Sequence, residues 1–263
     1  MTRTRSEETY AVSGLSHRYP AGDVLALQGI DMVLPKGSVT ALIGPSGCGK
    51  STLLNILSGL LRPTDGGVTL FGSPLTGPPD EVAHMFQKAT LLPWRTTLEN
   101  VVLPIEIRDG KKAAKAAYGK ARDLLRMVGI GDFEAAYPQA LSGGMAQRAA
   151  ICRMLITEPE VFLLDEPFGA LDELTRERMD IELLRIAKDS EATVVLVTHS
   201  IPESVFLSDR VYAMSARPGR IEEVIDIDLP APRTLDTFSD PHFVDRVGQV
   251  RRALNRGHGY DGQ

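Results

Sequence analysis

The sequence predicts an α/β fold with a mostly parallel sheet, an antiparallel β side sheet and an α-helical subdomain. The first observation is that three short, strongly apolar runs are each followed by a helical pattern, at residues 38–44 (SVTALIG), 161–165 (VFLLD) and 193–199 (TVVLVTH). Buried parallel strands have this appearance because both faces of their sheet are covered. The second observation is that the strand signal vanishes between about residues 88 and 158.

Turn residues and helical spacing predict further elements in the first half of the chain. Residues 10–35 and 67–72 predict shorter antiparallel strands with turns rich in Gly, Pro and Asp, such as PTDGG at 63–67. Residues 111–130 are rich in helix formers and carry apolar residues at helical spacing. We therefore place the side sheet before residue 73 and the helical subdomain after residue 87.

The last part of the chain predicts a hairpin and a helix. Residues 209–229 contain two strand patterns around a Pro-Gly turn. Residues 243–256 predict an amphipathic terminal helix. We expect the tail at residues 257–263 to be frayed.

The composition indicates a globular protein that folds unaided. Of 263 residues, 43% are hydrophobic and 24% are charged, and the net charge of -5 provides no overall basic field, so we expect no nucleic-acid partner. No window has the roughly 18 uninterrupted apolar residues of a membrane-spanning helix. The first ten residues lack the apolar section of a secretory signal, so we expect a cytosolic chain. Cys48 and Cys152 are too few for a disulfide framework or a zinc site.

A glycine-rich phosphate loop follows the first apolar run. Residues 44–51 (GPSGCGKS) fit the pattern G-x-x-x-x-G-K-[ST] between a predicted strand and the helical pattern TLLNILSGL. Backbone N–H groups and the helix N-terminus meet the anion, Lys50 reaches the β and γ phosphates, and Ser51 holds Mg²⁺. A glycine-rich turn without chemical meaning is the alternative, and the flanking strand and helix argue against it. The expected nucleotide contacts are Gly44, Pro45, Ser46, Gly47, Cys48, Gly49, Lys50, Ser51 and Thr52.

Two adjacent acids follow the second apolar run. Asp165 ends a predicted buried strand, where a carboxylate can orient the water shell of magnesium. Glu166 comes next and is expected to act as general base or to position the attacking water. A solvated glutamate at a strand end is the alternative reading, but Pro167 ends the strand at once and leaves the two acids without another purpose.

A second glycine-rich helix start, LSGGMAQR at residues 141–148, lies between these two motifs. It resembles the signature motif of the ATP-binding cassette ATPases, the nucleotide-binding subunits of ABC transporters, and the resemblance extends over about residues 10–225. It implies ATP and Mg²⁺ as cofactors. Met145 stands where glutamine is common in the family, and we expect this change to be tolerated because the anion contacts come from Ser142, Gly143 and backbone.

The resemblance also divides the chain into parts. An ABC ATPase domain is expected at residues 10–228, with a P-loop NTPase core of RecA type at about 10–87 and 159–228. The helical subdomain is expected at about 88–158. The C-terminal extension, residues 229–263, offers no motif beyond its terminal helix.

The signature motif predicts a dimer. Ser142 begins a helix whose free N–H groups, with Gly143 and Gly144, form an anion site. One nucleotide needs only one such cradle, and a site on a separate lobe does not reach the nucleotide of its own chain. We therefore expect two copies to pack head to tail, so that each signature motif closes over the γ-phosphate bound by the other copy. In the alternative, Ser142 merely caps a helix.

Three further residues are assigned by the resemblance alone. Gln87 matches the hinge glutamine between core and helical lobe, whose amide senses magnesium and the γ-phosphate. His199 matches the switch histidine that contacts the γ-phosphate and helps to fix the water. Asp172 matches the loop that communicates across the dimer, and it also fits a helix cap. We thus expect Glu166, His199 and Lys50 to be catalytic, and Ser51, Gln87 and Asp165 to form the metal site.

The adenine base requires an aromatic partner. Tyr19, in HRYP, is the best candidate for stacking on adenine because an aromatic face gives affinity without strong base specificity. Tyr10 is a competing candidate for this role. A buried position for Tyr19 in the side sheet is a second alternative.

A membrane partner is suggested by residues 88–107, which contain the only tryptophan. Leu92, Pro93 and Trp94 either pack in the core or line a groove for a helix of a transmembrane permease subunit, and we prefer the groove for Trp94. The wording LLPWRT is similar to the ATPases of bacterial importers for nitrate, sulfonates and taurine. This implies a peripheral position on the cytoplasmic face of the inner membrane, with an extracytoplasmic solute-binding protein as an indirect partner.

The expected function is therefore ATP hydrolysis that drives import of a small anion. A soluble ABC ATPase of DNA repair or translation is the alternative, but such proteins generally carry long coiled-coil insertions or a second cassette. A P-loop kinase would have no use for the signature or for His199, and a non-hydrolysing regulatory module is disfavoured by Glu166. The transported molecule does not touch this subunit, so its identity does not follow from the sequence.

Overall fold

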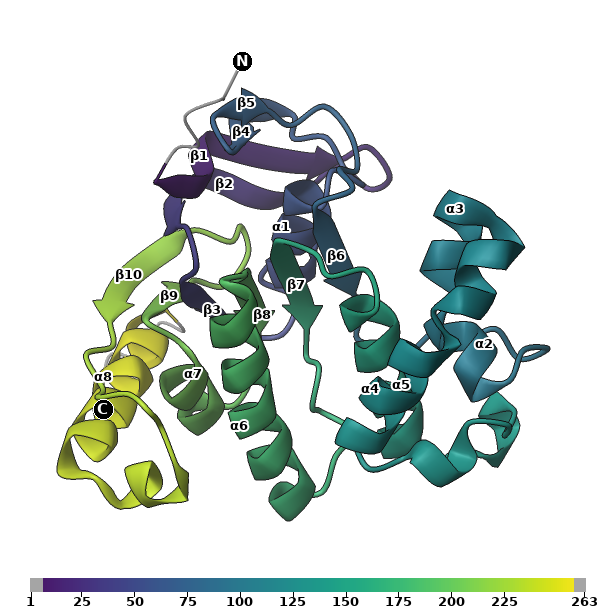
Figure 1. Ribbon diagram of the computed structural model, residues 1–263. Helices are drawn as coiled ribbons and strands as arrows, with labels where there is room; N and C mark the ends of the chain where they lie inside the picture. Colours follow the sequence, from purple (N-terminus) through teal and green to yellow (C-terminus); the bar gives the residue numbers. More distant parts are fainter. Residues whose placement is uncertain (1–6, 258–263) are drawn as a thin grey trace.

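A central sheet organises the protein in the computed structural model, which describes residues 7–257 (Figure 1). Its strands are β3 (Val39–Ile43), β6 (Val82–Met85), β7 (Val161–Asp165), β8 (Thr193–Val197), β9 (Arg210–Met214) and β10 (Ile221–Asp226). They lie in the order β10-β9-β3-β8-β7-β6. All pairs are parallel except β9 with β10, which form an antiparallel hairpin.

The three apolar runs of the sequence form β3, β7 and β8, which confirms the predicted parallel core. The predicted hairpin around the Pro-Gly turn is β9 and β10. β6 was not predicted as a strand, because it has only four residues, is partly exposed and includes His84. It pairs with β7 at the end of the sheet, so tertiary pairing rather than local pattern makes it a strand.

The predicted side sheet lies against one face of the core and is antiparallel throughout. Its strands, in the order β2-β1-β4-β5, are β1 (Glu8–Tyr19), β2 (Val24–Pro35), β4 (Asp65–Leu70) and β5 (Ser73–Pro74). It occupies the top of Figure 1, with α1 (Lys50–Leu57) between it and the central sheet. The fold class predicted from the sequence is thus confirmed.

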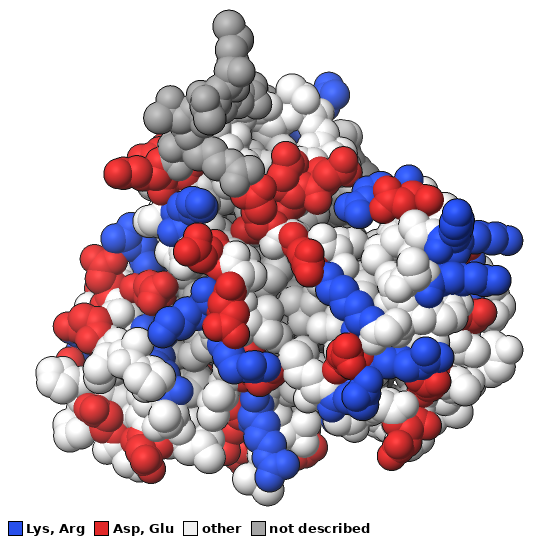
Figure 2. Space-filling model, in the orientation of Figure 1, with Lys and Arg blue, Asp and Glu red and all other residues white. Residues whose placement is uncertain are grey.

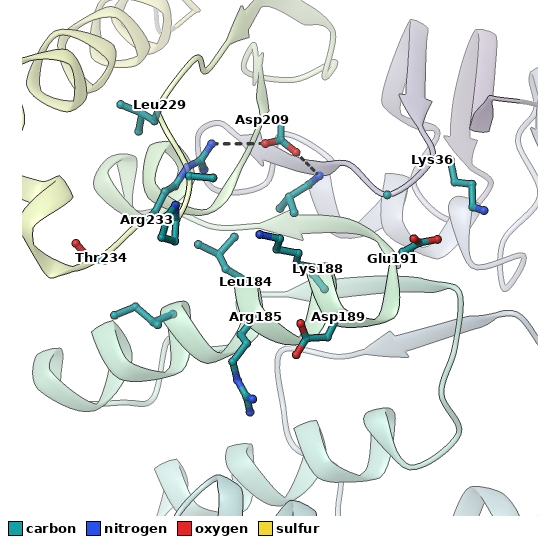
Figure 3. A pocket seen from close by; sticks show the side chains of 16 residues that line it. Lys36, Leu184, Arg185, Lys188, Asp189, Glu191, Asp209, Leu229, Arg233 and Thr234 are labelled. Carbon is teal, nitrogen blue, oxygen red and sulfur yellow. Dashed lines mark hydrogen bonds and ion pairs between the residues drawn. The ribbon is translucent and has the colours of Figure 1, made fainter.

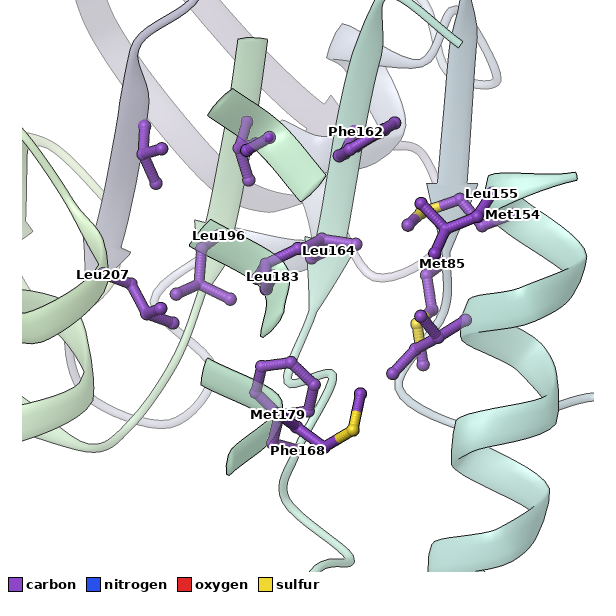
Figure 4. Close-up of a cluster of buried hydrophobic side chains, with 14 of the residues drawn as sticks. Met85, Met154, Leu155, Phe162, Leu164, Phe168, Met179, Leu183, Leu196 and Leu207 are labelled. Atoms are coloured by element: carbon purple, nitrogen blue, oxygen red, sulfur yellow. The ribbon is translucent and has the colours of Figure 1, made fainter. Parts of the chain in front are cut away.

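Side chains of the central sheet alternate between two apolar clusters, as expected for a sheet covered on both faces. Leu42, Leu163 and Val195 belong to the cluster that includes α1 and the side sheet. Leu164 and Leu196 belong to the cluster on the opposite face. Figure 4 shows how that second face packs against α5 (Gly143–Leu155) and α6 (Glu173–Ser190) through Met, Leu and Phe side chains.

Residues 88–158, all of which are described, contain helices and turns without a strand. The helices are α2 (Thr97–Val101), α3 (Leu103–Ala116), α4 (Tyr118–Met127) and α5. The stretch predicted to be helical at 111–130 is divided between the end of α3 and α4, which meet at Ala117. Of the apolar residues predicted at helical spacing, Leu125 and Val128 are buried and Leu124 packs partly buried against the core.

The terminal amphipathic helix is confirmed as α8 (Pro241–Gly257), which contacts β9, β10 and α7 (Ile201–Leu207). Phe243, Val250 and Ala253 of this helix are buried in the core. Phe238 stacks on Phe206 of α7 with ring centroids 4.5 Å apart. The end of the chain therefore covers the central sheet beside β9 and β10. The predicted fraying concerned 257–263, and 258–263 lie outside the described residues.

Lys and Arg side chains are interspersed with Asp and Glu on the face shown in Figure 2. This face does not present a continuous field of one sign, of the kind that holds a polyanion. Within residues 7–257, the helices do not combine the length and the apolar character that a membrane crossing requires.

Arg233 fastens the C-terminal extension to the core. Its Nη1 atom donates to the backbone oxygens of Phe206 and Ser208, both at 2.8 Å, and its Nη2 atom lies 3.5 Å from Asp209 Oδ1. Asp209 Oδ2 in turn accepts from Val39 N at 2.9 Å (Figure 3). The Arg233 side chain is only 7% exposed, so these bonds are shielded from water.

We predict that Arg233→Ala lowers the stability of the fold, because two backbone oxygens in a shielded place lose their donor. The expected loss is about 2 kcal/mol, since each buried unsatisfied group costs roughly 1–3 kcal/mol. In a thermal melt this corresponds to a decrease in Tm of about 5 °C for a chain of this size. Arg185→Ala is the matched control, because Arg185 forms an exposed pair with Glu182 and should hardly change Tm. Equal melting temperatures of the two variants would contradict the role of Arg233.

Candidate nucleotide site

The glycine-rich loop connects the carboxyl end of β3 to the N-terminus of α1. Gly49 has φ +103, and a Cβ atom there would lie 2.9 Å from Ala26 O, so this position requires glycine. A Cβ atom on Gly44 would likewise lie 2.9 Å from Met214 O. The loop is therefore held by close backbone packing, with its N–H groups beside the start of α1.

A cavity of about 450 Å³ opens over this loop. Its volume is in the range of small-molecule sites. It brings together Tyr19, Gly44, Ser46, Gly47, Gly49, Lys50, Ser51, Thr52, Gln87, Glu166 and His199 from the residues predicted for the site, with Val24, Ala26, Val197 and Arg217 in addition. The larger cavity of about 790 Å³ in Figure 3 lies between α6 and the 229–234 segment and shares no lining residue with this one.

Lys50 lines the cavity and is bonded to the phosphate loop. Lys50 Nζ donates to Gly44 O at 2.7 Å and to Pro45 O at 3.0 Å. Cys48 is 1% exposed and its Sγ atom lies 3.6 Å from Lys50 Nζ. Pro45 and Cys48 therefore belong to the loop without lining the cavity, and their side chains do not face a ligand there.

The residues predicted for the metal site lie close together. The Asp165 carboxylate, 7% exposed, accepts a hydrogen bond from Ser51. Burial raises the pKa of Asp165 and the charge of Glu166 raises it too, whereas the Ser51 hydrogen bond and Lys50 lower it. Hydroxyl, carboxylate and amide oxygens are the ligands that Mg²⁺ prefers, so this set of donors fits the ion.

Glu166 and His199 face each other at the carboxyl ends of β7 and β8. Glu166 Oε2 accepts from Gln87 Nε2 at 2.8 Å and lies 3.5 Å from His199 Nδ1. The backbone of Glu166 has φ +48, an uncommon conformation for a residue other than glycine, and its N–H donates to Val197 O at 2.9 Å. A carboxylate, an imidazole and an amide thus converge on one side of the cavity, where they can hold and deprotonate a water molecule.

Burial separates the two tyrosines that the sequence left open for adenine. Tyr10 is 0% exposed and its hydroxyl donates to Leu57 O at 2.7 Å, so it belongs to the core. Burial also raises the pKa of Tyr10 above its ordinary value. Tyr19 lines the cavity, and its hydroxyl is 3.1 Å from Thr52 Oγ1. The ring edge of His17 packs on it at a centroid distance of 4.7 Å, which fixes the orientation of the Tyr19 ring.

The signature residues lie apart from this cavity. Ser142 is the N-cap of α5, and its Oγ accepts from Met145 N at 3.3 Å. A Cβ atom on Gly144 would lie 2.9 Å from Leu171 Cδ2, whereas Gly143 has open space beside it. Among the described residues that line the cavity, Ser142, Gly143 and Gly144 do not occur.

Two other predicted features can be placed. Asp172 is the N-cap of α6, since its Oδ1 accepts from Thr175 N at 3.0 Å, and it does not line the cavity. Hydrogen bonds from Thr175 lower the pKa of Asp172. Met145, the departure from the usual family wording, packs against the apolar core. The helix-cap reading of Asp172 is thus confirmed, and its role across a dimer stays a prediction.

The sequence did not indicate Arg217 or Gly219. Arg217 lines the cavity, and its Nε donates to Gly47 O at 2.8 Å. A Cβ atom on Gly219 would lie 2.0 Å from Cys48 O, so the β9–β10 hairpin touches the phosphate loop there. Gly219 is the glycine of the predicted Pro-Gly turn, but that pattern says nothing about what the turn contacts.

We predict that Tyr19→Leu weakens the binding of ATP and of ADP by about 10-fold, because base–aromatic stacking contributes roughly 1–3 kcal/mol. Tyr19→Phe keeps the ring and should bind nearly as well as the native chain. Titration calorimetry with either nucleotide measures the effect, and Tyr137→Leu, at a half-exposed position outside the cavity, is the control. Native-like affinity of Tyr19→Leu would remove this residue from the adenine site.

Comparisons with known proteins now give the family. Residues 27–169 match the family described as ABC transporter. The chain is 40% identical over 251 residues to the aliphatic sulfonates import ATP-binding protein SsuB of Bacillus cereus, which covers 95% of this chain and 97% of SsuB. It is also 40% identical over 253 residues to the bicarbonate transport ATP-binding protein CmpC of Synechococcus elongatus, which covers 94% of this chain and 38% of CmpC.

A solved structure agrees with these relatives. The dimeric post-hydrolysis state of the ATP-binding cassette MJ0796, bound to ADP and Pi, matches with a TM-score of 0.74 at 28% identity, over 84% of this chain and 100% of that one. The resemblance that rested on the phosphate loop, the two acids and the signature motif is therefore confirmed. The chain belongs to the ABC transporter family, as an ATP-binding cassette protein.

Proposed function

We propose that this chain is the ATP-hydrolysing subunit of an importer for a small anion of the nitrate, sulfonate or taurine kind. The observation that carries the proposal is the match to SsuB along nearly the whole of both chains. CmpC is named for the transport of another small anion, bicarbonate, which supports the same substrate class. The alternative of a soluble ATPase in DNA repair or translation finds no support in these relatives.

The proposed chemistry is hydrolysis of the γ-phosphate by water. The water oxygen bonds to phosphorus while the bond to the bridging oxygen breaks, so the products are ADP and phosphate. Glu166 orients the water and takes its proton, and His199, 3.5 Å from that carboxylate, contacts the γ-phosphate. Lys50 and the loop N–H groups hold the β and γ phosphates. Ser51, Gln87 and Asp165 would hold Mg²⁺, which would supply positive charge to offset the charge of the phosphates.

The active unit in this proposal is a head-to-tail dimer. The cavity contains the phosphate loop, Glu166 and His199, but Ser142, Gly143 and Gly144 of the same chain do not line it. Ser142 caps a helix whose N-terminal N–H groups suit an anion. The related cassette bound to ADP and Pi is dimeric, which supports completion of each site by the second copy. Closure of the dimer on ATP then moves the helical lobes together, and hydrolysis reopens it.

The permease contact is proposed to include Trp94. Asn100, 0% exposed, accepts from Leu92 N at 2.7 Å and donates to the carbonyl oxygens of Leu92 and Arg95, so it fixes the preceding loop. Held in this way, Trp94 is 70% exposed, which argues against the core-packing alternative. An exposed tryptophan on a loop that Asn100 holds by hydrogen bonds is the type of anchor found at protein interfaces. The permease would hold the subunit at the cytoplasmic face of the membrane, and a solute-binding protein would deliver the anion on the other side.

We predict that Glu166→Gln lowers ATP turnover by at least about 100-fold, because the general base is lost. The variant should still bind ATP and should accumulate as a dimer in gel filtration with ATP, since the bridging γ-phosphate is not removed. ADP in place of ATP is the control and should leave it monomeric. A fully active, monomeric Glu166→Gln protein would refute the assignment.

Ser142→Arg added to Glu166→Gln locates the signature motif within the dimer. The bulky cation should block dimer formation while each monomer still binds ATP, as measured by calorimetry. Loss of ATP binding in the monomer would show that Ser142 belongs to the site of its own chain.

We predict that Trp94→Glu releases the subunit from its permease without changing ATP binding, because a charge replaces a buried anchor at the contact. Tagged native and variant chains are to be compared for co-purification of a membrane-embedded subunit from detergent-solubilised membranes of the source cells. Leu174→Glu, at another exposed apolar position, is the control. Unaltered co-purification of Trp94→Glu would contradict the contact. The native subunit, reconstituted with the co-purified membrane subunit, is then assayed for ATP-dependent uptake of nitrate and sulfonates.

A further inference from the structure

Two acidic side chains are buried behind the turn that carries His199. Asp180, on α6, is 3% exposed, and Glu203, on α7, is 8% exposed. These two helices pack against each other. Neither acid lines the 450 Å³ cavity, so neither is placed to touch a nucleotide.

Glu203 is connected to the His199 turn by a closed set of hydrogen bonds. The Thr198 hydroxyl, in a residue that is 1% exposed, donates to Glu203 Oε2. Thr198 Oγ1 accepts from Ser200 N at 3.0 Å, and Ser200 Oγ accepts from Glu203 N at 3.3 Å. The residues on both sides of His199 are therefore fixed to the start of α7.

His199 itself depends on this backbone for its place. Its side chain is 70% exposed, and its Nδ1 lies 3.5 Å from Glu166 Oε2. An imidazole with so few neighbours is oriented mainly by the turn below it. A second, small cavity joins the two parts of the system, since Glu166, Arg176, His199 and Glu203 all line it.

Burial and the neighbouring charges favour the protonated form of Asp180. Burial, followed by the charge of Glu203, raises the pKa of Asp180 to about 8, while Arg176 lowers it and Glu177 raises it. Burial also raises the pKa of Glu203, and the charge of Glu166 raises it further. The Thr198 hydrogen bond, Arg176 and His199 lower it. With its pKa raised to about 8, Asp180 is mainly protonated at pH 7. The Glu203 Oε2 atom accepts the hydrogen bond from Thr198. Asp180 Oδ1 and Arg176 Nε are both buried without a hydrogen-bond partner, so a direct ion pair does not neutralise Asp180.

We propose that Glu203 is a positioning residue for ATP hydrolysis: it holds the Thr198 hydroxyl and so fixes the turn from which His199 faces Glu166. The inference rests on the proposed function, in which Glu166 and His199 act on the attacking water. Glu203 acts through Thr198 and His199 and does not contact the reacting atoms.

A double-mutant cycle tests the path from Glu203 to His199. Thr198→Val keeps the shape and removes the hydroxyl, so kcat should fall by about 10-fold, as for a small misplacement of a catalytic group. The KM for ATP should stay within about 2-fold, because the phosphate loop is untouched. Thr198→Ser restores the hydroxyl and should recover most of kcat. Glu203→Leu should resemble Thr198→Val, and Glu203→Gln, which retains an acceptor, should lose less.

The cycle separates positioning from mere structural support. Combined with His199→Ala, Thr198→Val should cause no further loss of kcat, because both changes remove the same contribution. Additive losses would overturn the proposal, as would native kcat in both Thr198→Val and Glu203→Leu. Thermal melts and ATP binding show whether each variant is folded. If Thr198→Val or Glu203→Leu is misfolded, the conservative variants Thr198→Ser and Glu203→Gln are used for the comparison of kcat instead. If His199→Ala and Glu166→Gln themselves retain native turnover, the proposed function fails rather than this inference.

The pH dependence of kcat tests Asp180 separately. As pH rises through about 8, Asp180 loses its proton and a buried negative charge forms near Glu203, so native kcat should decline there. Asp180→Asn stays neutral and should keep the pH 7 value of kcat to higher pH. Asp189→Asn, at an exposed position of the same helix, is the control and should follow the native profile. The same alkaline decline in Asp180→Asn and in the native chain would contradict this role of Asp180.

Discussion

Val197 is in register with Leu42 of β3 on one side and with Asp165 of β7 on the other, and every functional group of the core depends on this alignment. Because the three strands are parallel, their carboxyl ends meet at one edge of the sheet, where ligands of open α/β sheets bind. The phosphate loop leaves β3 there, the two acids leave β7, and the His199 turn leaves β8. The ladder even continues past the strands, since Thr198 N donates to Leu42 O at 3.3 Å and Glu166 N donates to Val197 O at 2.9 Å. A slip of one residue in β8 would separate Glu166 from His199.

The helical region contributes to a different surface from the one that the sheet edge forms. Ser142 is the N-cap of α5, and a Cβ atom on Gly144 would lie 2.9 Å from Leu171 Cδ2, so the start of α5 packs closely on the turn before α6. Asp172 caps α6 directly after that contact. The two motifs proposed to meet the second copy are therefore in contact with each other within one chain. On the same chain, Gln87 reaches across to Glu166, so the strand that leads into the helical region ends at the proposed catalytic carboxylate.

Short sequence patterns were sufficient to predict the buried strands and the phosphate loop. β3, β7 and β8 are fully buried, so their runs of apolar residues were unambiguous, and the phosphate loop had a strand before it and a helix after it. β6 escaped because a short strand at the sheet edge has no apolar run of its own. The sequence could not decide between Tyr10 and Tyr19 as the adenine contact, and only the burial of Tyr10 in the structure distinguished them. Arg217 and Glu203 were missed for a related reason, since both act through contacts with residues that short motifs do not connect.

The contact between Gly219 and Cys48 links two segments that are remote along the chain. Any side chain at residue 219 would push a carbon atom into the carbonyl group of residue 48, at the centre of the phosphate loop. The hairpin and the loop thus cannot diverge independently in evolution: an insertion or a bulkier residue in one is tolerated only together with a compensating displacement of the other. A hairpin grafted from a distant cassette would consequently fit only if the phosphate loop of that cassette were grafted with it.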